Sequence, residues 1–153
     1  MEYFINCNTS TLAPYTVPLD QTRALHLYRR LGVSASAETI RQAVNQNAGN
    51  LVDTLVDQAL NMPLLPAPVW ADWTNANYPE DGDARRQLQN EQRGQFRLDY
   101  ANGLLKNNLR DRLSFFWSNH FVTEVDVYNC NSFLYYYINC LQRNSLGNFK
   151  TFV

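Results

Sequence analysis

The sequence predicts an all-α protein, an irregular bundle of about five helices with a connecting loop rich in proline and tryptophan. Apolar residues recur at steps of three and four along most of the chain, which is the spacing of a helix with one buried face. Signals for β-strands are nearly absent, and there is no repeat of solenoid period. The 153 residues, 45% hydrophobic and 18% charged, suffice for the core of one globular domain.

The chain is expected to consist of an irregular N-terminal arm at 1–19 and a single helical domain at 20–153. The first helix is expected to run from Asp20, whose side chain can cap the N-terminus, to Leu31. Gly32 then ends it, because glycine is strongly preferred just beyond a helix C-terminus.

Two shorter helices are expected next, at 37–47 and at 51–60. Ser36 precedes the first and Asn50 the second, and both side chains can cap a helix N-terminus. Asp53 stands three residues after Asn50, at the position of a capping-box acid. The link between the two helices is short, which favours antiparallel packing.

The loop at 62–79 contains four prolines, which preclude a continuous helix, and two tryptophans, Trp70 and Trp73. One interpretation of the tryptophans is a surface that stacks on a peptide or a sugar. The favoured interpretation is a loop anchored across the bundle, because large aromatic side chains in such connections usually serve as packing anchors.

A long helix is expected from Asp83, as its N-cap, to about Asn107. It either continues into the next helix or breaks near 106–108, and the shared register of its leucines favours near-continuity. Its arginines, Arg86, Arg93 and Arg97, can share one face. A strip that contacts phosphates is one interpretation, but a solvated face with local ion pairs is favoured.

The most specific stretch is NLRDRLSFFWSNHFVT, residues 108–123. Asn108 can cap a helix there, and Asp111 occupies the position of a capping-box acid. The spacing predicts a buried aromatic seam on one face. Its members are Leu109, Leu113, Phe116, Trp117, His120 and Phe121.

His120 is the candidate functional side chain of this stretch, with Asn119 and Trp117 as its candidate partners. A general base or a metal ligand is one interpretation of His120. A core histidine with hydrogen-bonded ring nitrogens is favoured, as is a core position for Trp117. No second ligand lies at helical spacing on the apolar side, so we predict neither a metal nor a cofactor.

A last full helix is expected from Tyr128 to Ser145, and the first turn of a further helix at 149–153. Net charge is −1, which gives no general attraction to nucleic acid or anionic membrane. No apolar run approaches the length of a membrane span, and no secretory signal is visible. Cytoplasm is therefore the default expectation.

The run FFWSNHF, preceded by LRDRL and followed by LQRNSLGNFKTF, resembles domain-of-unknown-function family 1800, an uncharacterised bacterial family. The earlier run HLYRRLG at 26–32 is similar to a second block of that family, in the right order. Members are usually several hundred residues long and often look exported, and a diagnostic acidic block follows the point where this chain ends. The resemblance implies the N-terminal part of a helical protein truncated at its C-terminal end.

Three functions from different classes stay open, because fold and family resemblance do not fix function. The favoured hypothesis is a structural or interaction module, whose exposed aromatic surface pairs with a missing C-terminal half or a partner chain. The alternative is half of an enzyme site, such as a hydrolase, around His120 and completed by residues beyond Val153. The weakest is nucleic-acid binding through the arginine strip. Whether the protein is an enzyme, and its oligomeric state, are left open.

Overall fold

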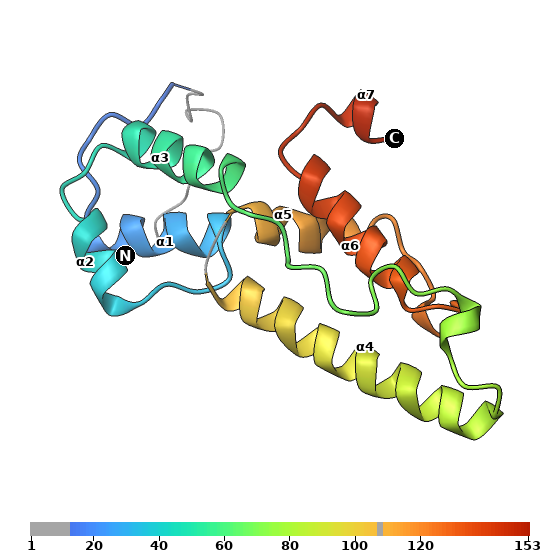
Figure 1. Cartoon of the computed structure of the whole chain (residues 1–153). Coiled ribbons are helices and arrows are strands. Elements are labelled where there is room, and N and C mark those ends of the chain that lie inside the picture. Colours follow the sequence, from blue (N-terminus) through green and yellow to red (C-terminus); the bar gives the residue numbers. More distant parts are fainter. Residues whose placement is uncertain (1–12, 107–108) are drawn as a thin grey trace, which may run out of the picture.

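The computed structural model describes residues 13–106 and 109–153, and every regular element within these ranges is helical (Figure 1). The all-α class is therefore confirmed. The described residues hold seven α-helices, two of them very short, together with single turns of 3₁₀ helix. Most of the predicted arm and Asn108 lie outside the described residues.

The first half of the chain forms α1 (Gln21–Leu31), α2 (Ala37–Ala43) and α3 (Ala48–Leu60). The predicted ends of α1 are confirmed. The Asp20 side chain accepts a hydrogen bond from the Arg23 backbone N–H at 2.8 Å, and helix geometry stops at Leu31. These signals are local, so they need no tertiary partner to act.

The predicted boundary between α2 and α3 is wrong. Asn45 adopts a left-handed conformation with φ of 67°, which a helix cannot contain, so α2 ends four residues before the expected position. The Asn45 N–H instead donates to the carbonyl of Leu19 at 2.8 Å. Asn47, rather than Asn50, then caps α3 by accepting from the Asn50 N–H at 3.2 Å.

A small apolar core joins α1, α2 and α3 at one end of the molecule (Figure 1). Its buried members are Leu19, Ala24, Tyr28, Ile40, Ala43 and Leu51. Because Leu19 precedes α1 and exchanges backbone hydrogen bonds with residues 45 and 46, the segment before the first helix is pinned to the link after the second.

The second half holds α4 (Gly82–Leu105), α5 (Leu109–Ser118), α6 (Ser132–Asn144) and α7 (Phe149–Phe152). Near-continuity of α4 and α5 is wrong, since α4 ends at Leu105 with Lys106 as its C-cap and α5 is a separate helix that runs in a different direction (Figure 1). The N-cap of α4 is Asp81 rather than Asp83, and α6 begins four residues later than expected because Val125–Val127 forms a separate 3₁₀ turn.

The loop between α3 and α4 runs between α4 and the α5–α6 pair (Figure 1). Trp70 is buried there against Phe96 of α4, with ring centroids 5.5 Å apart. Trp73 is half-buried and meets the Tyr78 ring edge to face at 5.4 Å. The favoured interpretation of an anchored loop is confirmed for Trp70, which belongs to the second core with Phe96, Leu134, Ile138 and Leu141.

Among the described residues, none of the helices combines the length and the apolar character that a membrane crossing requires.

Candidate functional site

The α5 helix buries polar side chains and exposes two of its phenylalanines. The predicted buried seam is therefore wrong for Phe116 and His120, whereas Trp117 and Phe121 are half-buried against the second core. Arg110, Asp111 and Ser114 are exposed by only 5%, 3% and 0%. Phe115 and Phe116 are exposed by 40% and 46%. Helical spacing identified which residues share a face, but it did not identify which face the rest of the chain covers.

Arg110 and Asp111 form a buried ion pair that we call the polar hub. Two nitrogens of the Arg110 guanidinium donate to one Asp111 carboxylate oxygen, at 2.9 and 3.0 Å. The third donates to the backbone carbonyls of Met62 and Pro63, at 2.7 and 2.6 Å. Asp111 thus lies inside the protein as the acceptor of this pair, and the predicted partner of its capping box, Asn108, lies outside the described residues.

Gln142 of α6 extends the polar hub to a third element. Its side-chain amide donates to the same Asp111 oxygen at 2.9 Å and accepts from the Leu65 backbone N–H at 3.0 Å. On the next turn of α5, the hydroxyls of Ser114 and Tyr100 share a hydrogen bond of 3.1 Å, and burial raises the pKa of Tyr100. The inner side of α5 is therefore held by directional bonds to the loop, α4 and α6.

The outer side of α5 leads into a cluster of rings that we call the aromatic face. Trp117 is its centre, with ring centroids of its neighbours between 5.1 and 5.8 Å away. The members are Phe116, Trp117, His120, Phe121, Phe149 and Phe152. Trp117 is half-buried, and among the described residues its indole N–H, itself buried, has no acceptor.

His120 is exposed, so the favoured core position is wrong, although the expected bond to a backbone carbonyl is present. Its Nδ1 lies 3.0 Å from the Phe116 carbonyl oxygen. A carbonyl only accepts, so Nδ1 carries the hydrogen and, in the neutral ring, Nε2 keeps its lone pair. The neighbouring Asn119 is also exposed, and its side chain donates to the Phe115 carbonyl at 3.1 Å.

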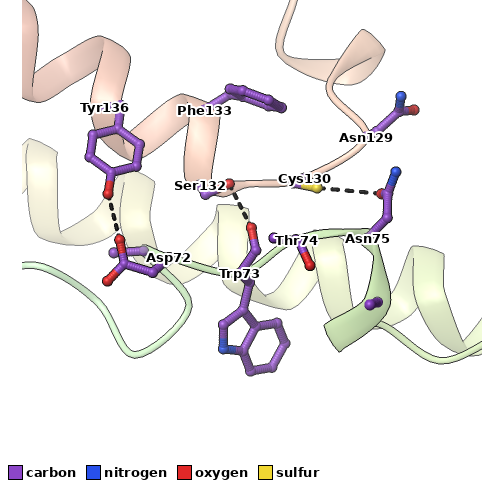
Figure 2. A pocket seen from close by; sticks show the side chains of 11 residues that line it. Asp72, Trp73, Thr74, Asn75, Asn129, Cys130, Ser132, Phe133 and Tyr136 are labelled. Carbon is purple, nitrogen blue, oxygen red and sulfur yellow. Dashed lines mark hydrogen bonds between the residues drawn. The ribbon is translucent and has the colours of Figure 1, made fainter.

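A cavity of about 610 Å³ lies where the tryptophan loop meets the start of α6 (Figure 2). Three hydrogen bonds cross it. Tyr136 donates to Asp72, which raises the pKa of the tyrosine, while Ser132 donates to the Trp73 carbonyl at 2.9 Å. The third joins the Cys130 thiol to the side-chain oxygen of Asn75 at 3.3 Å.

These three bonds commit the Tyr136 and Ser132 hydroxyls and the Cys130 thiol to joining the loop to α6 and the segment before it. We therefore read this cavity as a structural seam with an exposed aromatic rim, where the Phe133 ring is 56% exposed. Sequence reasoning missed the seam because the bonded residues are 55 to 64 positions apart in the sequence, and no local pattern links them.

The predicted arginine strip on α4 is divided by ion pairs. Arg86 pairs with Asp83, and Arg93 pairs with Asp126 at 2.6 Å while its own side chain is 11% exposed. Arg97 is exposed. A local ion pair, the favoured interpretation of this face, is thus confirmed for Arg86, whereas the partner of Arg93 lies 33 residues away and outside α4. No group of three candidate metal ligands occurs in the part of the chain that the structure describes.

Comparison with known proteins gives one match. The model of a family described as a protein of unknown function (DUF1800) matches residues 26–153. No curated protein and no solved structure matches the chain.

Proposed function

This chain belongs to the protein family of unknown function DUF1800, and from that premise we propose that it is an interaction module whose aromatic face is covered by further polypeptide. The observation that carries the proposal is the reversed polarity of α5. Its inner side is fixed by the polar hub, while large rings on its outer side are left uncovered.

Uncovered rings of this kind favour contact with another polypeptide. Phe116 and Phe149 are exposed by 46% and 54%, and both stack on or beside Trp117. Contiguous exposed apolar patches on a folded chain mark interaction sites, and aromatic residues are enriched at the centres of interfaces. The unpaired indole N–H of Trp117 supports the same proposal, because a covering segment can supply its acceptor.

The total exposed surface also supports a covered face. The chain exposes 10868 Å², whereas a folded monomer of 17.7 kDa exposes about 7,900 Å². Even if residues 1–12 contributed the surface of a fully extended segment, about 2,000 Å², the remainder would exceed the area expected for its mass. The covering polypeptide is either a C-terminal part of a longer family member or a separate partner chain.

Photo-crosslinking tests the proposal. Phe116 is replaced by p-benzoylphenylalanine in the native host, and the cells are irradiated. The control carries the same residue in place of Leu98, which is 61% exposed on α4 and outside the aromatic face. We expect a discrete adduct from position 116 and none from position 98. Mass spectrometry then distinguishes a partner chain from a segment of the same chain. Equal adducts at both positions, or none at 116, would contradict the proposal.

A second candidate function is half of an enzyme site at His120, completed by residues of the covering polypeptide. The observation in its favour is the exposed ring with Nδ1–H held by the Phe116 carbonyl, since histidines that act as bases or ligands through Nε2 usually donate their other N–H in this way.

Complementation of a host deletion separates the two functions. If the protein acts only by contact, His120→Gln restores the phenotype and Phe116→Ser does not. If the enzyme hypothesis holds, His120→Gln fails to complement while still forming the adduct at position 116. Retention of the adduct shows that the loss is not a loss of binding.

A further inference from the structure

A second feature lies beside the aromatic face, where the end of α1 meets the outer side of α5. A cavity of about 550 Å³ is lined there by three arginines, Arg29, Arg30 and Arg112, which we call the arginine pocket. Leucine side chains and the rings of Phe115 and Phe116 line the rest. Asn119 is the remaining polar residue of the lining, and no acidic residue belongs to it.

The three arginines have no counter-charge among the described residues. Five other arginines of the described chain form ion pairs with Asp or Glu. The side chains of Arg29, Arg30 and Arg112 form neither an ion pair nor a hydrogen bond with the part of the chain that the structure describes, and all three residues are exposed. Three like charges around one cavity repel one another unless an anion joins them.

The helix dipoles stabilise two of these positive charges and disfavour the third. Arg29 and Arg30 occupy the last turn of α1, where a cation is favoured. Arg112 lies in the first turn of α5 as described, where the positive end of the helix disfavours a cation. Its charge is thus unfavourable within its own helix and has no partner beside it, which points to a partner outside the chain.

We propose that the arginine pocket binds an acidic segment of a partner chain, two or three Asp or Glu residues with an apolar residue between them. This inference rests on the proposed function, because it names the chemistry of the polypeptide that covers the outer side of α5. The guanidinium fork binds carboxylates through paired hydrogen bonds, and the adjacent Phe115 and Phe116 rings accept the apolar residue.

The surroundings favour a peptide over a nucleic acid. The net charge of the chain is −1, and two of the three arginines of the α4 strip are paired, Arg86 with Asp83 and Arg93 with Asp126, so that only Arg97 of that strip could extend a basic track. Nucleic-acid backbones are followed by long cationic grooves. An isolated set of three cations over an apolar lining matches a few carboxylates instead.

Fluorescence anisotropy with the whole chain tests the inference. The probe is a fluorescein-labelled peptide of sequence Gly-Glu-Phe-Glu-Leu-Glu-Gly, and the matched control has Gln in place of each Glu. We expect the acidic peptide to bind at least about tenfold more tightly than the control. Its binding weakens as salt rises from about 50 to about 300 mM, because exposed charges are screened.

Three variants localise the binding. Arg112→Glu is expected to weaken the acidic peptide by about tenfold or more, whereas Arg97→Glu, the same charge change at an exposed arginine of α4, leaves it unchanged. Arg112→Gln, which only neutralises the charge, gives a smaller loss in the same direction, and thermal melts of all three verify folding.

Equal weakening by Arg97→Glu, equal binding of the Gln peptide, or no binding at all would overturn the inference. Displacement of the peptide by a lower concentration of oligo-dT would replace it with nucleic-acid binding. If only this inference fails, the adduct at position 116 persists in Arg112→Glu. If the proposed function itself fails, the chain that keeps Arg112 also gives no adduct from position 116.

Discussion

The inner and outer sides of α5 differ in how they hold their neighbours. The inner side carries Arg110, Asp111 and Ser114, whose hydrogen bonds reach the loop, α4 and α6. The outer side carries Phe115 and Phe116, whose rings are partly bare. A surface helix normally has the opposite distribution. The polar side fixes the position and rotation of the helix through directional bonds, and this leaves the apolar side available for contacts with something else.

The difference between the two sides of α5 requires that the polar hub stabilise the fold. Asp111→Ala tests this requirement and is expected to have the largest effect. Removal of the carboxylate leaves the Arg110 guanidinium buried without its acid, which typically costs about 3–5 kcal/mol of unfolding free energy. Urea denaturation of purified protein measures it. Asp83→Ala is the control, because Asp83 and its partner Arg86 are 86% and 72% exposed and such surface pairs contribute about 1 kcal/mol or less. Equal losses in both variants would contradict the role of the hub.

Gln142→Ala tests whether the hub depends on α6. The change leaves the Leu65 N–H without its acceptor and removes one donor to Asp111, so we expect a loss of about 1–3 kcal/mol by the same urea method. Gln87→Ala is the matched control on an exposed side of α4, where the change is expected to stay within about 0.5 kcal/mol.

The stability of the fold at alkaline pH tests the role of Tyr100 on the inner side of α5. Burial raises the pKa of Tyr100 above its ordinary value of 10.0, so the folded state holds the phenolic proton more tightly than the unfolded state. Its contribution to stability is complete below pH 10 and is lost as pH rises from there through the folded pKa. Tyr100→Phe is expected to reduce the fall of melting temperature above pH 10.

The outer side should give the smallest effect on stability. Phe116→Ser removes a large ring, yet the ring is 46% exposed, so we expect a loss of about 1 kcal/mol or less in unfolding free energy. The same variant should lose the contact function in the complementation test. A loss as large as that of Asp111→Ala would mean that the rings of α5 are core after all, and would abolish the distinction between its two sides.

Much of the fold could be predicted because its signals are local. The caps at Ser36 and Asp20 and the class of the fold follow from neighbouring residues. The inner side of α5 could not be predicted, because Arg110 is satisfied by the carbonyl of Met62, 48 residues earlier, and Asp111 by Gln142, 31 residues later. In the sequence alone, an Arg-Asp pair at the start of an apolar helix indicates only that the helix begins at the surface.

For the candidate site, too, the arrangement within one helix could be predicted and the arrangement between helices could not. The spacing placed Trp117 and His120 together correctly, and their ring centroids are 5.8 Å apart. It could not place Phe149 against Trp117 or bring Arg29 beside Arg112, because both depend on how separate helices pack. The roles proposed for His120 and Asn119 remain predictions.

The loop between α3 and α4 is attached at two distant points, and this bears on how the protein can evolve. The Met62 carbonyl accepts from Arg110, and the Trp73 carbonyl accepts from Ser132 at 2.9 Å. Surface loops usually tolerate insertions and deletions. Here we expect an insertion or deletion between these carbonyls to displace an acceptor from a fixed donor, so the two attachments constrain the length of this irregular segment.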